Sequence, residues 1–252
     1  MRCVLRVLVL APLLLASCAH VAAYRAPPPY PCHRIATADV TLDGRLDEPV
    51  WAHLPAIMLG RLKDGARPAV SSVVRFAWTD EALYVGAVLE DADLLATITE
   101  HDGRLWEDDC FEFYVNPVPG QVLPYVEFEV NARGAWYDSL VLDLRKTLSP
   151  RYEQPWKHNF EPPGVAVTVA PLTGAVKGWA VEMRVPLSAF VLTQDVPAKE
   201  GQVWRVAVFR VNQRGGGLPA EEYAWRPVAS GRFHAPEAFA PVVLAGALPA
   251  MP

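Results

Sequence analysis

Apolar and polar residues alternate with a period of two along much of the chain, which is the pattern of half-buried β-strands. In the clearest segment, Phe111, Phe113 and Val115 fall on one face of an extended strand, and Glu112 and Tyr114 fall on the other. A core-facing row of aromatics backed by a Glu/Tyr row is more than a generic strand requires. We therefore predict that this strand forms the floor of a small-molecule site.

The same alternation predicts further strands at residues 73–78, 83–90, 125–131, 136–144, 165–170, 179–185, 203–211 and 242–244. No segment of ten or more residues has a helical period, so only short helical turns are expected. One of them follows Asp47, a suitable N-cap with Glu48 and Pro49 behind it. The predicted fold class is all-β: a two-sheet antiparallel β-sandwich, jelly-roll-like, with short helical turns.

Pairing of 111–115 with 125–131 would place the polar rows of both strands on one sheet face. The members of that face are Glu112, Tyr114, Tyr125, Glu127, Glu129 and Asn131. Carboxylates accept hydrogen bonds from hydroxyls, an amide both donates and accepts, and rings cover apolar C–H patches, so a polyhydroxylated ligand would suit this face. The alternative is an outer sheet surface wet by solvent; exposed aromatics favour binding.

The first residues have the pattern of an export signal. Arg2 and Arg6 precede an apolar run at 7–15 that is too short to span a bilayer. The sequence Leu-Ala-Ser-Cys that ends at Cys18 resembles the bacterial lipobox. The resemblance implies cleavage before Cys18 and its acylation, and Ala19 after it indicates the outer membrane. A plain secretory signal is the alternative.

Residues 1–17 are thus predicted to be a lipoprotein signal peptide, 18–32 a Pro-rich tether and 33–252 the folded domain. Pro27 to Pro29 and Pro31 favour an extended tether from lipid to domain. Loss of residues 1–17 removes two Arg and no acid, so the net charge of −5 becomes −7. No basic stripe occurs, and this excludes nucleic acid as a partner.

Four cysteines occur in the chain. Cys3 leaves with the signal and Cys18 would carry lipid, so Cys32 and Cys110 remain. Export to an oxidising compartment favours a Cys32–Cys110 disulfide, with two separate free thiols as the alternative.

Five motifs in order resemble the family 9 carbohydrate-binding modules, from about His33 to the C-terminus. They are Leu42-Asp43-Gly44 with Leu46-Asp47-Glu48 and Trp51; Trp78-Thr79-Asp80-Glu81-Ala82-Leu83-Tyr84-Val85; Trp106-Glu107-Asp108-Asp109-Cys110-Phe111-Glu112-Phe113-Tyr114; Phe128-Glu129-Val130-Asn131; and Gly178-Trp179 with Glu182 and Val185-Pro186. The resemblance implies a β-sandwich that holds terminal sugars between two tryptophans and binds them without catalysis.

Carried over by position, the resemblance implies that Trp106 stacks on the sugar, that Glu112 is a carboxylate ligand and that Asn131 is an amide ligand. Two positions differ from the family's sugar binders: Glu129 stands where they have an arginine, and Phe233 where they have the second tryptophan. A different sugar, a cation-bearing ligand and no ligand at all therefore stay open. Tyr114 and Glu127, on the same predicted face, complete the candidate carbohydrate-binding residues.

The sequence leaves two other non-catalytic functions open. A haem-binding electron carrier would need axial ligands from among Met58, His101, His158, Met183 and His234, although Met183 lies on an apolar row. A structural or interaction module with a decayed sugar site is a further alternative.

A glycoside hydrolase could use Glu112 and Glu129 as its carboxylate pair, but no nucleophile-and-base signature occurs, so no catalytic residue is assigned and an enzyme is not expected. Turn and cap roles explain Asp43 and Asp47, so no metal site is assigned, and structural calcium stays open. The overall prediction is non-catalytic saccharide binding by an exported, membrane-anchored lipoprotein, in polysaccharide capture or catabolism, with a glycan-processing enzyme as a candidate partner.

Overall fold

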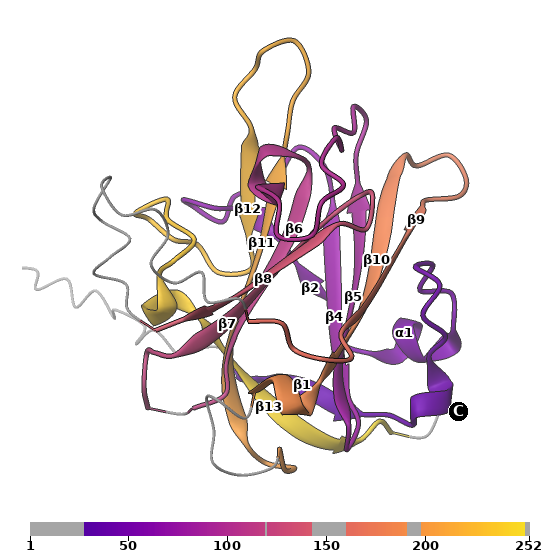
Figure 1. The fold of residues 1–252 in the computed structure, drawn as a ribbon, viewed down its shortest axis with the longest axis vertical. Helices are drawn as coiled ribbons and strands as arrows, with labels where there is room; N and C mark the ends of the chain where they lie inside the picture. The colour runs from indigo at the N-terminus through magenta and orange to yellow at the C-terminus, as the bar shows by residue number, and fades with distance from the viewer. Residues whose placement is uncertain (1–27, 119, 143–159, 191–197, 250–252) are drawn as a thin grey trace, which may run out of the picture.

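The protein is almost entirely built from β-strands (Figure 1). The computed structural model describes residues 28–118, 120–142, 160–190 and 198–249. Its strands are β1 (Tyr30–Arg34), β2 (Ile57–Met58), β3 (Gly60–Arg61), β4 (Ser72–Trp78), β5 (Ala82–Glu90), β6 (Cys110–Asn116), β7 (Tyr125–Asn131), β8 (Trp136–Val141), β9 (Ala166–Pro171), β10 (Gly178–Pro186), β11 (Val203–Asn212), β12 (Glu221–Ala224) and β13 (Ala240–Ala247). The helix α1 (Pro49–His53) and single 3₁₀ turns at Thr37–Asp39, Leu105–Glu107, Leu187–Phe190 and Pro236–Ala238 complete the described elements.

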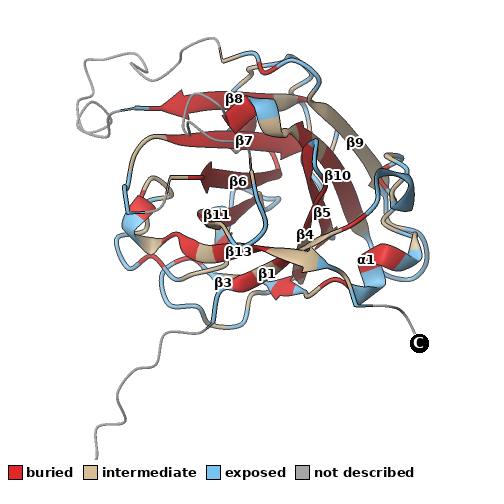
Figure 2. Cartoon of the chain, turned by 90° about the horizontal axis from the view of Figure 1, so that it is seen from below, coloured by how far each residue is buried: buried red, intermediate tan, exposed pale blue. Residues whose placement is uncertain are grey.

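The main strands form one mixed sheet in the order β8-β7-β6-β11-β13-β1-β4-β5-β10-β9. This corrects the predicted two-sheet antiparallel sandwich. Strand β1 is parallel to both β13 and β4 and joins the two halves, while the other pairs along this order are antiparallel. The halves therefore wrap round a common interior as one nearly closed sheet (Figure 2).

Strand β1 was not predicted, because its prolines indicated a tether. It begins at Tyr30, inside the segment 18–32 that was assigned to the tether, so regular structure starts before residue 33. Tyr30 and Cys32 are buried, and the Tyr30 hydroxyl donates a hydrogen bond to the Pro55 carbonyl at 2.7 Å. Burial of these two side chains holds the segment in place despite Pro31.

Local pattern located the longer strands well. Strand β7 has the predicted bounds, and the other predicted strands are found with ends shifted by a few residues. The short strands β2, β3 and β12 were not predicted. Helix α1 begins at Pro49 with Glu48 in the N-cap position and without a side-chain cap bond, so the prediction of an Asp47 cap was wrong.

The interior between the two halves holds the main core. The apolar rows of β6 and β7, including Phe113 and Phe128, pack there with residues of the opposite half such as Phe76, Trp179 and Val181. The rings of Phe113 and Phe128 stack with centroids 5.1 Å apart. The other row of β6 and β7 therefore points away from this core, as alternation predicts.

The predicted Cys32–Cys110 disulfide is absent, and both thiols are free and buried. Cys32 lies in the main core on β1, whereas Cys110 lies on β6 in a separate cluster with Leu105 and Tyr137. Strands β11 and β13 stand between β6 and β1, a separation of roughly 14 Å at the usual strand spacing. Disulfides need Cα atoms within about 7 Å, so the fold keeps these cysteines apart.

Several predictions concern residues outside the described ranges. These are the signal peptide, lipidation of Cys18, the tether up to residue 27, and His158 as a haem-ligand candidate. Within the described ranges, no helix has the length and apolar character needed to cross a membrane.

Candidate functional site

A cavity of about 440 Å³ opens on the face of β6, β7, β8 and β11 that points away from the main core. Segments before β6, on either side of β12 and before β13 form its sides. The lining residues are Trp106, Glu112, Tyr114, Glu127, Glu129, Tyr137, Val211, Gln213, Ala220, Glu222, Gly231, Phe233 and His234. This face is the one that the polar rows of the sequence predicted.

Sheet register brings the floor of the cavity together. Glu112 on β6 lies directly opposite Glu129 on β7, and Tyr114 lies opposite Glu127. Tyr137 on β8 is in turn opposite Glu129. Successive strands thus place their polar rows side by side, which is what one-face alternation requires.

The floor is deeply buried, which differs from the exposed concave surface and exposed aromatics that the sequence indicated. Only 2% of Glu112 and 3% each of Glu127 and Glu129 remain exposed, and Tyr114 and Tyr125 are fully covered. Strand alternation reports direction but not what lies above a face. Here Tyr114 and Tyr125 pack in a second apolar cluster with residues from the segment between β12 and β13, among them Val228, Ala235 and Phe239.

Each floor carboxyl group has a nearby hydrogen-bond donor. Tyr114 donates its phenol hydrogen to Glu112 Oε2 at 2.6 Å, and Ser139 donates to Glu127 Oε2 at 2.7 Å. The Cys110 thiol lies 3.8 Å from Glu129 Oε2, a weak donor at long range. All three donors are neutral groups.

Burial raises the pKa of Glu112 to about 8; the bond from Tyr114 opposes this rise, and the charges of Glu127 and Glu222 add to it. Burial also raises the pKa of Glu129 well above its usual range, with further contributions from Glu112 and Glu127. Both effects disfavour ionisation. At neutral pH, burial therefore favours the protonated forms of Glu112 and Glu129.

Trp106 forms one wall. It lies on the 3₁₀ turn Leu105–Glu107, is half-buried, and meets Tyr137 edge to face with ring centroids 6.1 Å apart. The Arg104 guanidinium is 5.7 Å from the Trp106 ring and pairs with Glu107 at 2.9 Å.

Phe233 forms another wall. It stacks on Phe209 and is only partly buried. Trp106 and Phe233, far apart in sequence, thus line the same cavity.

His234 is a cavity residue that the sequence marked only as a haem-ligand candidate. Its Nδ1 lies 2.6 Å from the Tyr125 hydroxyl, and its Nε2 lies 3.9 Å from Glu127 Oε1. Its ring stacks on Tyr114 with centroids 5.5 Å apart. Tyr137, Gln213 and Glu222 were also missed, because they come from strands and loops without a distinctive local pattern.

Asn131 is the one predicted site residue that does not line the cavity. Its amide nitrogen donates to the Ile98 carbonyl at 2.8 Å and to Asp108 Oδ2 at 2.9 Å. Its amide oxygen accepts from the backbone N–H groups of Arg133 and Ala135, both at 3.1 Å. These bonds anchor the turn after β7 and the loop before β6.

The sequence profile of carbohydrate-binding family 9 matches residues 59–244, a span that contains every residue lining the cavity. The chain belongs to carbohydrate-binding family 9. The family resemblance of the sequence is thereby confirmed, and the predicted site residues other than Asn131 meet in one family 9 cavity. Their contacts with a sugar stay a prediction.

Solved structures show that the family 9 fold extends over nearly the whole chain. A Bacteroides uniformis ATCC 8492 protein inferred to bind carbohydrate is 20% identical, with a TM-score of 0.64 over 85% of this chain and 97% of its own. A family 9 module from Caldicellulosiruptor kristjanssonii in complex with cellotriose is 15% identical, with a TM-score of 0.61 over 89% and 100%. The same organism's family 9 module in complex with glucose is 13% identical, with a TM-score of 0.57 over 86% and 97%. Among curated proteins, none matches this chain.

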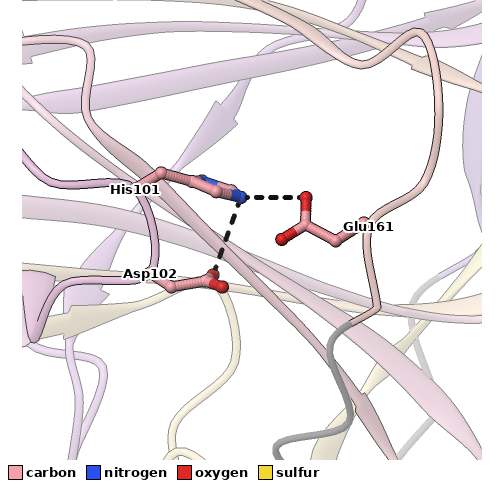
Figure 3. Close-up of side chains that lie close together, drawn as sticks. All are labelled: His101, Asp102 and Glu161. Carbon is pink, nitrogen blue, oxygen red and sulfur yellow. Dashed lines mark hydrogen bonds and ion pairs between the residues drawn. The ribbon is translucent and has the colours of Figure 1, made fainter.

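A second cluster of titratable groups lies outside the family 9 cavity (Figure 3). His101 Nε2 is 3.3 Å from Glu161 Oε2 and 3.9 Å from Asp102 Oδ1, while its Nδ1 is 2.8 Å from the Trp136 carbonyl. The His101 ring also packs on Trp136 with centroids 4.3 Å apart. This cluster fastens the turn before β6 over Trp136 at the start of β8.

The remaining candidates for ligands lie apart from one another. Met58 is exposed on β2, and Met183 is buried in the main core, as its apolar row predicted. Asp43 accepts a hydrogen bond from the Arg45 N–H at 3.0 Å, in the turn role predicted for it. Of the described haem-ligand candidates, His234 alone lines the cavity.

Proposed function

We propose that this family 9 protein binds a saccharide in the cavity without transforming it. The observation that carries the proposal is the joint placement of Trp106 and Phe233 in the walls of a cavity whose floor is carboxyl groups. Sugar rings present apolar C–H patches to aromatic side chains and hydroxyls to carboxyl groups. The complexes of the Caldicellulosiruptor kristjanssonii modules with cellotriose and glucose support a saccharide ligand.

Isothermal titration of the chain from residue 18 with a panel of neutral, acidic and basic oligosaccharides tests this proposal. We expect saturable binding at one site and at least a fivefold loss with Trp106→Ala, because the variant removes a stacking ring. Met58→Ala is the control, since it removes an exposed apolar side chain outside the cavity. If no saccharide binds, or if Trp106→Ala binds as the natural chain does, the proposal fails and a module with a decayed sugar site becomes the better account.

The proposal extends to the place where binding occurs. The Leu-Ala-Ser-Cys sequence that ends at Cys18 supports lipid anchoring of an exported protein, with the proline-rich segment as a spacer and the outer membrane as destination. A saccharide held there would serve polysaccharide capture or catabolism beside a glycan-processing enzyme. Labelling of cells with a fatty-acid analogue tests the anchor: the full chain should carry label in the membrane fraction, and Cys18→Ala should carry none. Equal labelling of both would exclude Cys18 as the attachment point.

A further inference from the structure

The cavity is strongly acidic and lacks a matching cation. Four of its lining residues are glutamates: Glu112, Glu127, Glu129 and, at the rim, Glu222. In the described parts of the chain, no lysine or arginine lines it, and its one basic side chain is His234. Arg104 lies against Trp106 but is paired with Glu107.

Two buried carboxylates elsewhere in the protein, Asp91 and Glu182, have strong partners, although Asp138 Oδ2 is buried with no hydrogen-bond partner among the described residues. Asp91 is paired with Arg210 at 2.9 Å, with both side chains fully buried. Glu182 accepts three N–H bonds, from the backbone of Asp43 at 2.9 Å and Gly44 at 2.8 Å and from the Trp51 indole at 2.8 Å. A buried carboxylate is costly without such partners, and the fold supplies them for Asp91 and Glu182.

The hydrogen bonds to the cavity glutamates come from neutral donors, and only Glu127 has a basic group near it, His234 Nε2 at 3.9 Å. Tyr114 and Ser139 each give one hydrogen bond, and the Cys110 thiol is a weak donor 3.8 Å from Glu129. Glu112 and Glu129 lie opposite one another in sheet register, so like charges would meet at the cavity floor. The missing positive charge is therefore expected from the ligand.

Asp91 and Glu182 thus have strong partners within the fold, whereas Glu112 and Glu129 do not. From this contrast we infer that the ligand is an amino sugar with a free, protonated amine, an inference that rests on the saccharide site proposed above. An ammonium group has three N–H donors and a full positive charge, and it can serve Glu112 and Glu129 together. Hydroxyls of a neutral sugar supply donors but no charge. An N-acetylated amine supplies one donor and no charge, and it brings a methyl group to an acidic floor.

The raised pKa values of Glu112 and Glu129 fit this ligand. An incoming ammonium group can neutralise the carboxylate charge that a bound proton neutralises before the ligand binds. On binding, Glu112 or Glu129 ionises and its proton passes to the solvent buffer. The other titratable groups that face the two glutamates are Cys110, Tyr114, Glu127, Tyr137, Glu222 and His234.

Three trisaccharides with the same β-1,4 linkage form a matched probe set: fully deacetylated glucosamine trisaccharide, its N-acetylated counterpart and cellotriose. At about pH 6.5, where a sugar amine is charged, we expect the glucosamine trisaccharide to bind at least tenfold more tightly than the other two. Its apparent binding heat should change with the ionisation enthalpy of the buffer, which reports the released proton. A linear diaminoalkane, which has the charge without the ring, should bind at least tenfold more weakly than the amino sugar.

Glu129→Gln should remove most of the preference for the amine, whereas Glu200→Gln, which changes an exposed acid outside the cavity, should leave it unchanged.

Cellotriose binding that equals or exceeds that of the glucosamine trisaccharide would overturn the inference and leave the saccharide proposal intact. Amine preference retained in Glu129→Gln, or a diaminoalkane that binds equally well, would also overturn it. Failure of all three trisaccharides would overturn both. The comparison of ligands on the natural chain does not depend on how well any variant folds.

Discussion

Phe233 lies parallel to Phe209, with ring centroids 4.5 Å apart and an angle of 10° between the ring planes. Phe209 is buried on β11, so one face of Phe233 is occupied and the ring is held at the cavity. An aromatic ring fixed in this way is a prepared platform for a sugar face, because its orientation is set before the ligand arrives.

We expect Phe233→Ala to weaken saccharide affinity about threefold to tenfold, which corresponds to roughly 0.5–1.5 kcal/mol for a lost aromatic contact. Phe233→Trp should preserve or strengthen binding, since the larger ring covers more apolar area. Titration calorimetry measures both, and Leu142→Ala, which shortens an exposed side chain outside the cavity, is the control. Equal affinities for the Ala and Trp variants would show that the ring does not contact the ligand.

The raised pKa of Glu112 should make the protein more stable in mild acid than at neutral pH. The pKa of Glu112 is about 8 in the folded protein, against 4.5 as its ordinary value, so the folded state binds the proton more tightly than the unfolded chain. The free energy of unfolding therefore falls as pH rises from about 4.5 to 8 and levels off above, with a contribution on the order of a few kcal/mol.

Urea unfolding at a series of pH values checks this slope. Glu112→Gln should flatten it between about pH 5 and 8, because an amide does not titrate, while Glu200→Gln should leave it as it is. A slope of the opposite sign that Glu112→Gln removes would contradict the assignment.

The buried pair of Arg210 and Asp91 should be a strong determinant of stability. Arg210 also donates to Asn212 Oδ1 at 2.6 Å and Ser72 Oγ at 3.0 Å, so its removal leaves Asp91 as a buried, unpaired charge. We expect Arg210→Met to lower the free energy of unfolding by about 3–5 kcal/mol. The exposed pair of Arg214 and Glu221, at 3.3 Å, is the matched comparison, and Arg214→Met should cost less than about 1 kcal/mol.

A double variant, Arg210→Met with Asp91→Leu, separates the charge effect from lost packing. It should recover a large part of the loss, because no buried charge is left. Urea unfolding measures all these variants, and an Arg210→Met cost as small as that of Arg214→Met would refute the buried-charge argument.

His101 should titrate above its ordinary pKa of 6.5 (Figure 3). Partial burial lowers its pKa, but the bond to the Trp136 carbonyl and the charges of Asp102 and Glu161 raise it by more. The cluster thus stabilises the fold while His101 is protonated, and this contribution is lost as pH rises through the raised pKa.

Proton NMR titration of the imidazole checks this directly. Glu161→Gln and Asp102→Asn should each lower the pKa of His101, whereas Asp64→Asn, in an exposed pair with Arg61, should not change it. An unchanged pKa in both cluster variants would show that the carboxylates do not act on His101.

Much of the cavity could be predicted from local sequence because strand alternation is a local property. Once Phe113 and Phe128 face the core, Glu112, Tyr114, Glu127 and Glu129 must face the other way. The family motifs added Trp106 and Phe233. Alternation could not predict how deeply these side chains are buried, because the same row is consistent with a solvent-exposed face and with a buried cavity floor. Asn131 shows the same limit, because its direction was predictable but its bonds to the Ile98 carbonyl and Asp108 were not.

The sequence by itself determined that this is a β protein with short helical turns, where its long strands lie and which side chains share a face, since each follows from residues close together in the chain. Only the tertiary structure decided that β1 joins both halves into one sheet, that Cys32 and Cys110 lie on strands too far apart to bond, and that loops close over the glutamates of β6 and β7. These features depend on contacts between segments that are distant in sequence. The same contacts desolvate the cavity carboxyl groups, and this desolvation raises the pKa of Glu112 and Glu129.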